Sequence, residues 1–231
     1  MFEFRMTEEQ ELLLESLREL IERELPESYV RECEEEHKPM TEFMEKWREA
    51  GFHLLGVPEE CGGTPVDILT LMLFQMEVNR LTSAGYALGT NAISIDDMKT
   101  FGSEEQFAET MRMVCEGRNP FALGLTEACA GSDSSGIQTT FERRDGKIYI
   151  NGSKMFCTGA GETDHMLCMT VDPKCEDPRM KFTTWWVDMH SPGITMEPIK
   201  KTGWNMIKTY NVMLRDVVCE EKDVVGVEGC G

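Results

Sequence analysis

Residues 123–136 read LGLTEACAGSDSSG, and they follow a short apolar run from Phe121 to Leu125 that predicts a strand. After that run the apolar side chains give way to two glycines and several hydroxyl-bearing residues. A loop of this kind gathers hydroxyls and backbone N–H groups in one concave place, which suits a phosphate or the edge of a flavin. Taken alone, the same pattern is also typical of a plain turn after a strand.

A second stretch gives the first one a more specific meaning. Residues 151–159 read NGSKMFCTG. Together, the two stretches resemble the paired middle-domain signatures of the acyl-CoA dehydrogenase family, in the same order and at the expected separation. The resemblance extends from about residue 3 to residue 231 and includes LGVPEECGG at 55–63.

The first half of the chain has the periodicity of helices. The predicted helices run from Thr7 to about Pro26, from Thr41 to Ala50, and over 66–81, 86–100 and 103–116. Thr7 and Ser103 each precede a glutamine by three residues, which is the capping-box pattern. The segment 66–81 is apolar nearly all round, so we expect a buried helix there.

After Gly117-Arg118-Asn119-Pro120 the pattern changes to short strands. Asp145-Gly146 predicts a hairpin between two of them, and Asn151-Gly152 predicts another tight turn. The predicted strands cover 139–143, 147–150, 154–158, 166–171, 182–188, 194–197 and 210–218. Such a set suggests a sandwich or barrel. With the family resemblance, the expected fold class is α+β: a helical domain over 1–118, then an antiparallel β-barrel domain over 119–231, without the family's C-terminal helical domain.

Composition excludes several functional classes. The 231 residues carry a formal net charge of −19, which argues against nucleic acid and against an anionic membrane surface as partners. No apolar run is long enough for a membrane span, and the N-terminus lacks a signal pattern. Nine scattered cysteines without a C-x-x-C pair favour reduced thiols and a cytoplasmic location. Hydrolase motifs such as G-x-S-x-G and H-E-x-x-H are also missing from the sequence.

The resemblance implies an FAD-dependent oxidoreductase acting on CH–CH bonds, which interconverts an acyl-CoA and its 2,3-enoyl-CoA. In this family a flavin N5 exchanges hydride with the substrate Cβ. Carried over to this sequence, the implied cofactor-binding residues are Leu123, Leu125, Thr126, Gly131, Ser132, Phe156, Cys157 and Thr158. Thr158 is expected beside N5 and Thr126 at the pyrimidine end of the flavin. Ser132 is expected to contact the pantetheine arm of the substrate as well.

The resemblance also places the catalytic glutamate in the C-terminal domain, so we expect no catalytic base in this chain and no activity from it alone. Asn205 stands where the family usually has an arginine, which weakens the expectation of native-like cofactor binding. The best likeness within the family is to crotonobetainyl-CoA reductase-type members. An electron-transfer flavoprotein partner and homo-oligomerisation of the full-length protein are then implied. The alternative is a truncated, non-catalytic module that associates with partner subunits.

Overall fold

The computed structural model describes residues 5–82, 84, 88, 91–177 and 179–231. Their contacts divide the chain into two compact units. Unit 1 contains the residues up to Ala92 together with Lys201–Ile207. Unit 2 contains Ile93–Lys200 and Lys208–Gly231. These units are defined by contacts and are not the same as the two predicted domains, so the domain boundary expected after residue 118 stays a prediction.

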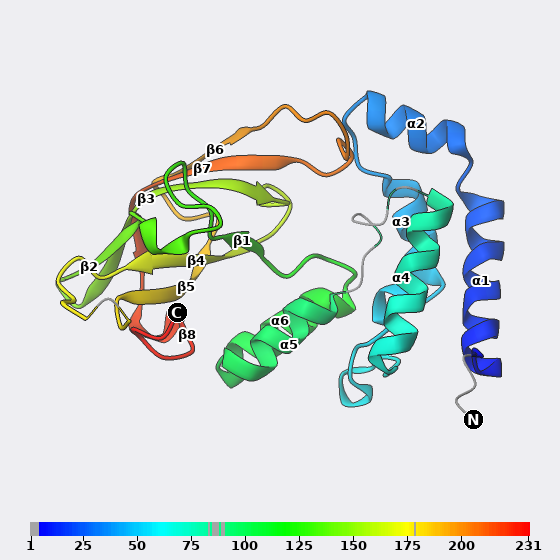
Figure 1. Cartoon of the computed structure of the whole chain (residues 1–231), viewed down its shortest axis with the longest axis horizontal. Helices are drawn as coiled ribbons and strands as arrows, with labels where there is room; N and C mark the ends of the chain where they lie inside the picture. The colour runs from blue at the N-terminus through cyan, green and yellow to red at the C-terminus, as the bar shows by residue number, and fades with distance from the viewer. Residues whose placement is uncertain (1–4, 83, 85–87, 89–90, 178) are drawn as a thin grey trace. The chain divides into compact units, whose positions relative to one another are not determined.

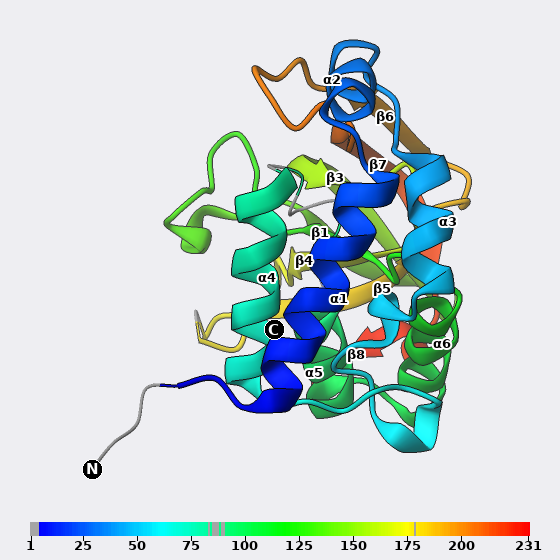
Figure 2. The same ribbon diagram turned by 90° about the vertical axis from the view of Figure 1, so that its right-hand side faces the viewer.

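Unit 1 is helical. Its helices are α1 (Glu8–Glu24), α2 (Glu27–Glu35), α3 (Thr41–Glu49) and α4 (Ile68–Thr82), with short 3-10 turns at Phe52–Leu54 and Glu59–Cys61. The capping box predicted at Thr7 is confirmed: the Thr7 hydroxyl accepts from the Gln10 N–H, and the Gln10 side chain accepts from the Thr7 N–H. Helix α1 lies alongside α4 in both views of the ribbon (Figures 1 and 2).

The core of unit 1 forms because α1, α3 and α4 each turn an apolar stripe inward. Leu14 and Leu17 of α1 belong to one buried apolar cluster with Trp47, Phe52 and Phe74. The Trp47 and Phe52 ring centroids lie 5.0 Å apart, and those of Phe52 and Phe74 lie 5.3 Å apart. Tilted ring pairs at such distances stabilise a core beyond the burial of their area.

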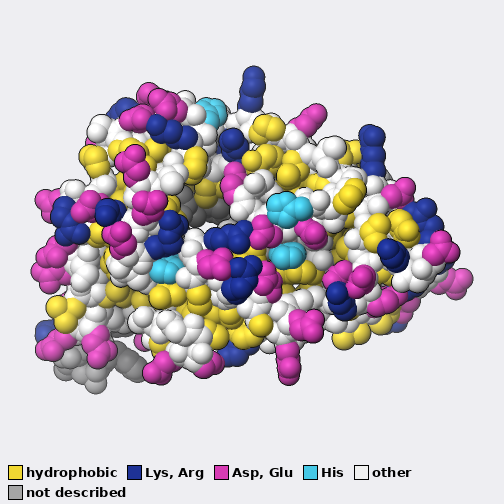
Figure 3. Space-filling view, turned by 180° about the vertical axis from the view of Figure 1, so that it is seen from behind, with side chains coloured by type: hydrophobic (Ala, Val, Ile, Leu, Met, Phe, Trp, Pro, Cys, Tyr) yellow, Lys and Arg dark blue, Asp and Glu magenta, His cyan; other side chains and the backbone are white. Residues whose placement is uncertain are grey.

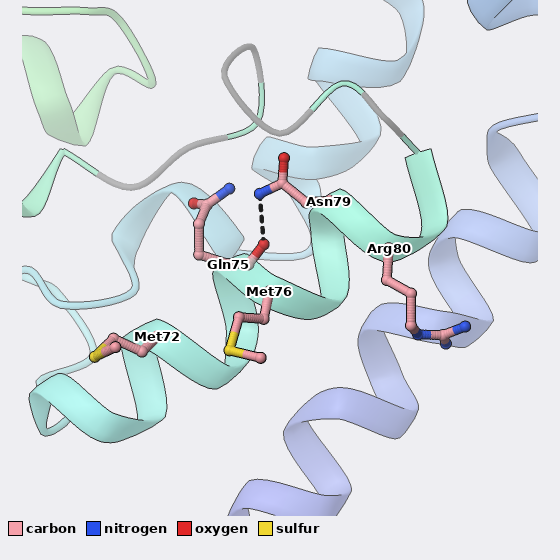
Figure 4. Close-up of a pocket in the computed structure, with 5 residues that line it drawn as sticks. All are labelled: Met72, Gln75, Met76, Asn79 and Arg80. Carbon is pink, nitrogen blue, oxygen red and sulfur yellow. Dashed lines mark hydrogen bonds between the residues drawn. The ribbon is translucent and has the colours of Figure 1, made fainter.

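The prediction that 66–81 forms a buried helix and not a surface helix is wrong. Helix α4 buries Phe74 and Val78 but exposes an apolar face made of Ile68, Leu69, Met72 and Met76. Met72 and Met76 line a shallow groove of about 590 Å³ together with Gln75, Asn79 and Arg80 (Figure 4). A helix that is apolar all round needs a partner on every side, and within the described residues α4 has partners on one side only.

Helix α2 was not predicted, and it holds the loop Lys201–Ile207 in unit 1. Pro26 is the N-cap of α2, so the proline that ends one helix also begins the next. The Glu34 carboxylate of α2 accepts hydrogen bonds from the Asn205 N–H at 2.7 Å and from the Asn205 side-chain amide at 2.9 Å. Met206 of the same loop is buried in the core of unit 1. Asn205 therefore has a local structural role that does not need an arginine.

Unit 2 combines two helices with a sheet. The helices are α5 (Ala92–Phe101), of which only the first residue is assigned to unit 1, and α6 (Glu104–Cys115). The strands are β1 (Ala122–Gly124), β2 (Thr140–Arg144), β3 (Lys147–Thr158), β4 (His165–Val171), β5 (Phe182–Asp188), β6 (Ile194–Pro198), β7 (Thr209–Cys219) and β8 (Val224–Val225). The predicted helix 86–100 begins on residues outside those described, and its described part belongs to α5. The capping box predicted at Ser103 is confirmed at the start of α6.

The sheet of unit 2 is open, so the expected closed barrel is not found. Its strand order is β6-β7-β3-β2-β4-β5-β8, with β1 paired in parallel to β4 beside this path. Most pairs are antiparallel, as expected, and the hairpin at Asp145-Gly146 joins β2 to β3. Among the described strands, no ladder joins β6 to β8, so the order has two free ends.

The tight turn predicted at Asn151-Gly152 is also wrong, because β3 runs through it as one long strand. The register with β7 shifts between Ile150 and Gly152 and again between Lys154 and Cys157. The first shift adds a residue to β7 and the second adds one to β3. Irregularities of this kind bend a strand and redirect its side chains without ending it. A bulge and a turn use the same small residues, so the sequence pattern does not separate them.

The surface carries both signs of charge despite the net charge of −19. Figure 3 shows acidic and basic side chains interspersed over the face that it displays, with apolar side chains between them. Among the described residues, no helix combines the length and the apolar composition needed to cross a membrane.

Candidate functional site

The two signature stretches of the sequence meet in unit 2. The Met155 N–H of β3 donates to the Thr126 carbonyl at 2.7 Å, which places the start of the 125–139 loop beside the end of β3. The end of the same loop crosses β3 at Gly152, where an added Cβ would lie 2.6 Å from the Thr139 Cα. Only glycine allows this close approach of the two backbones.

A buried ion pair holds the loop against β3. Lys154 Nζ lies 2.7 Å from the Glu127 Oε1, and neither side chain has more than 4% of its surface exposed. The same ammonium donates to the Leu125 carbonyl at 3.3 Å. The Glu127 carboxylate also accepts from the N–H groups of Gln138 and Thr139, at 2.7 and 3.1 Å. One pair of charges thus binds both ends of the loop.

These contacts determine the ionisation of Glu127. Burial raises the pKa of Glu127, but hydrogen bonds from Lys154, Thr139 and Gln138 outweigh it, so the pKa lies below its usual range. A carboxylate that already accepts three hydrogen bonds and stays ionised is a poor acceptor for a substrate proton. Glu127 therefore has a structural role here.

Three apolar side chains are exposed around the junction of the two stretches. Leu123, Leu125 and Phe156 have 57%, 43% and 58% of their surface exposed. Phe156 lies at the second register shift, in the bulge of β3, and has a φ of 57°, in the left-handed region that bulky residues rarely adopt. Such strain occurs preferentially at ligand-binding sites. The arrangement offers apolar surface to a planar group.

Three hydroxyls complete the set. Within the described chain, the hydroxyls of Thr126 and Ser132 have no hydrogen-bond partner and are free to bind a ligand. The Thr158 hydroxyl lies 3.1 Å from that of Thr209, its direct partner across β3 and β7. Thr126 and Thr158 are both half-exposed. Thr126 belongs to the 125–139 loop and Thr158 to β3, and the Thr126–Met155 hydrogen bond joins these two segments.

The other predicted residues lie differently. The Cys157 thiol points into the core of unit 2, and burial raises its pKa to about 11, so only its backbone is available to a ligand. Gly131 and Ser132 are exposed farther along the loop, and within the described residues no hydrogen bond joins them to Thr126 or to β3. An added Cβ at Gly131 would meet nothing within 4 Å, so the space beside it is open.

Sequence reasoning missed two residues that build this site. Lys154 follows the buried Ile150 by four residues and Gly152 by two. Because side chains alternate along a strand, this spacing places the lysine on an inward face. A charge at such a position signals a buried partner. Thr209 could not be found in this way, because its role depends on the register between β3 and β7.

Comparison with known proteins identifies the fold to which this site belongs. Residues 7–118 match the acyl-CoA dehydrogenase N-terminal domain, and residues 122–217 match the acyl-CoA dehydrogenase middle domain. The chain belongs to the acyl-CoA dehydrogenase family. It is 46% identical over 230 residues to the probable acyl-CoA dehydrogenase YdiO of Escherichia coli K12, an alignment that covers 99% of this chain and 60% of that protein.

Solved structures agree with this family assignment. Butyryl-CoA dehydrogenase from Megasphaera elsdenii matches with a TM-score of 0.83 and 25% identity, over 100% of this chain and 61% of its own. A chain in the structure described as the electron transferring flavoprotein of Acidaminococcus fermentans matches with a TM-score of 0.86 and 28% identity, again over 100% of this chain and 61% of its own. This acyl-CoA dehydrogenase-family chain therefore spans about three fifths of the length of the relatives that it matches.

Proposed function

We propose that the chain is the FAD-binding part of an acyl-CoA dehydrogenase or enoyl-CoA reductase. The observation that carries this proposal is the combination, at one junction, of exposed Leu123, Leu125 and Phe156 with the Thr126 hydroxyl, which has no hydrogen-bond partner among the described residues. An isoalloxazine needs apolar surface for its ring and hydrogen-bond donors for its polar edge. The residues present fit both needs.

Each residue then has a defined task. The Leu125 backbone and the Thr126 hydroxyl bind the pyrimidine end of the flavin, and Phe156 packs on its ring beside Leu123. The backbones of Gly131 and Cys157 and the hydroxyl of Ser132 contact the cofactor, with Ser132 also near the pantetheine arm of an acyl-CoA. Thr158 would lie beside the redox-active nitrogen of the bound cofactor. When bound, FAD supplies the hydride chemistry, and the protein supplies placement and polarity.

The proton-removing carboxylate is proposed to come from outside residues 1–231, in the C-terminal helical domain that the family resemblance implies. Glu127 is saturated with hydrogen bonds and does not replace it. We therefore propose that residues 1–118 and 119–231 form two domains of a three-domain enzyme. These two domains alone do not convert substrate to product. Acyl-CoA or enoyl-CoA as substrate, an electron-transfer flavoprotein as partner, a homo-oligomeric full-length protein and a cytoplasmic location belong to the same proposal. So does the likeness to crotonobetainyl-CoA reductase.

Titration of the purified chain with FAD tests the cofactor site directly. We expect saturable binding, measured by the quenching of flavin fluorescence. Thr126→Val should weaken it about five- to tenfold, because one hydrogen bond to the ligand is lost. Thr195→Val is the matched control, since Thr195 lies on β6 outside the site, and it should bind as the parent chain does. A chain that takes up no FAD contradicts the proposal.

The exposed face of α4 favours a second candidate, a non-catalytic module that associates with partner subunits. Ile68, Leu69, Met72 and Met76 form a continuous apolar strip that a partner could cover. A chain that binds no FAD but forms defined complexes through this strip would support that candidate over the first.

A further inference from the structure

The tip of the 125–139 loop, residues 131–135, is exposed along its whole length and carries the Ser132 hydroxyl. The ion pair of Glu127 and Lys154 binds the two ends of this loop, and none of its hydrogen bonds reaches the tip. A loop that is held only at its ends keeps conformational freedom in its middle, and a ligand that contacts the tip must remove this freedom on binding. The position of Ser132 therefore depends on a separate contact between the tip and the sheet.

Lys181, the residue directly before β5, makes that contact. Its ammonium donates to the Ser135 carbonyl at 3.1 Å and lies 4.8 Å from the centroid of the Phe182 ring. Hydrogen bonds from Ser135 lower the pKa of Asp133 in the same tip, and the Lys181 charge lowers it further. Among the residues that the structure describes, the Lys181–Ser135 bond is the only hydrogen bond between 131–135 and a segment outside the loop.

The backbone of Lys181 has a fixed place from which to hold the tip. Its carbonyl accepts from the Asp172 N–H at 2.8 Å, which continues the ladder between β4 and β5. The next residue, Phe182, packs on the buried apolar cluster that contains Ala130 and Ile137, one on either side of the tip. Because this backbone is already ordered, the bond has to fix only the lysine side chain and the tip itself. One hydrogen bond can therefore position the tip.

We propose that Lys181 is a positioning residue of the candidate site, which holds the Ser132 hydroxyl in place through the Ser135 carbonyl. The inference rests on the proposed function, in which Ser132 contacts the bound FAD. Lys181 and Lys154 then have separate tasks, since Lys154 fixes the ends of the loop and Lys181 fixes its tip. A tip that is ordered before FAD arrives loses less conformational entropy on binding, so the Lys181 bond increases the affinity.

Titration of the chain with FAD, measured by the quenching of flavin fluorescence, tests this role. Lys181→Met removes the donor but keeps most of the length of the side chain, and it should weaken FAD binding about three- to tenfold. Lys181→Arg keeps a cationic donor and should recover most of the affinity. Lys174→Met is the matched control, because Lys174 is exposed in the connection between β4 and β5, and it should bind FAD as the parent chain does.

A double-mutant cycle shows whether Lys181 acts through the tip. Ser132→Ala removes the hydroxyl that Lys181 is proposed to position. In the Ser132→Ala background, Lys181→Met should therefore weaken FAD binding by less than about twofold. A direct contact between the Lys181 charge and FAD, or a packing defect, would cost the same factor in both backgrounds, and that result would overturn the inference.

The remaining outcomes separate this inference from the function beneath it. If the parent chain binds no FAD, the proposed function fails and the inference fails with it. If FAD binds and Lys181→Met binds it as tightly as the parent chain does, the inference alone is overturned. Equal losses with Lys181→Arg and Lys181→Met would likewise overturn it, because the donated hydrogen bond would then not be the cause.

Discussion

Lys154 is a fully buried lysine that contacts one carboxylate and one backbone carbonyl. An ammonium in such a place is tolerated only because Glu127 neutralises it, and the carboxylate in turn depends on the ammonium. Both ends of the 125–139 loop are bound by this pair. At the scale of single residues, the charge pair therefore links the stability of unit 2 to the shape of the candidate site.

Replacing Lys154 by Met should lower the free energy of unfolding by about 3–5 kcal/mol, because a buried carboxylate loses its counter-ion. Urea denaturation measures the change. Lys147→Met on the same strand is the control, since Lys147 is exposed, and it should stay within about 0.5 kcal/mol of the parent chain. A loss below about 1 kcal/mol for Lys154→Met would contradict the assigned role. The double variant with Glu127→Gln should recover part of the loss.

At the scale of elements, Glu77 of α4 joins that helix to α1. Its carboxylate pairs with Arg80 of its own helix and with Arg18 of α1. Hydrogen bonds from Arg80 lead the causes that lower its pKa to about 2, and contacts with Arg18 add to them against the effect of burial. Because the folded pKa lies below the ordinary value of 4.5, ionised Glu77 stabilises the fold above pH 4.5, and this stabilisation is lost as the pH falls toward about 2.

Glu77→Gln should therefore destabilise the chain by about 1–2 kcal/mol at pH 7, a figure that allows for solvent screening of the exposed arginines. The difference between parent and variant should shrink as the pH falls from 4.5 to about 2. Thermal unfolding at several pH values measures it. A difference that is constant across this range would mean that Glu77 acts by packing and not by charge.

Much of the element layout could be predicted, and the failures have physical causes. Both capping boxes and the Asp145-Gly146 hairpin were predicted correctly, because each depends on residues three positions apart or fewer. The register shifts between β3 and β7, the short strand β8 and the open ends of the sheet depend on pairing between distant segments, which periodicity does not encode. The exposed face of α4 shows the same limit, since an apolar sequence does not say which side of a helix has a partner.

The residues of the candidate site also fall into two groups: those that belong to short motifs and those whose position depends on pairing between distant strands. The loop glycines, Thr126 and Phe156 belong to short motifs that the sequence reveals, and their role toward a cofactor stays a prediction. The thiol of Cys157 faces the core because of a register shift in β3, which no motif reveals. The partnership of Thr158 with Thr209 joins residues 51 positions apart and depends on that same register.

At the scale of the whole molecule, the apolar strip on α4 predicts self-association of the chain. Ile68, Leu69, Met72 and Met76 are all more than half exposed, and the groove beside Met72 and Met76 gives a partner a place to pack. Sedimentation velocity should show oligomers that grow with concentration. Met72→Gln combined with Met76→Gln should shift the distribution toward monomer, whereas Glu42→Gln on α3 should not. A parent chain that remains a monomer at high concentration would contradict this prediction.

The hydrogen bonds from Asn205 to Glu34 of α2 affect any experiment that cuts the chain into two pieces. Unit 1 is made of two separate pieces of sequence, and the second is the seven-residue tip between β6 and β7. Severing the chain once, anywhere before that tip, removes Met206 from its hydrophobic surroundings and deprives Glu34 of two donors. An isolated amino-terminal half should accordingly be expressed as a loosened, protease-sensitive product, and co-expression with the remainder should rescue it.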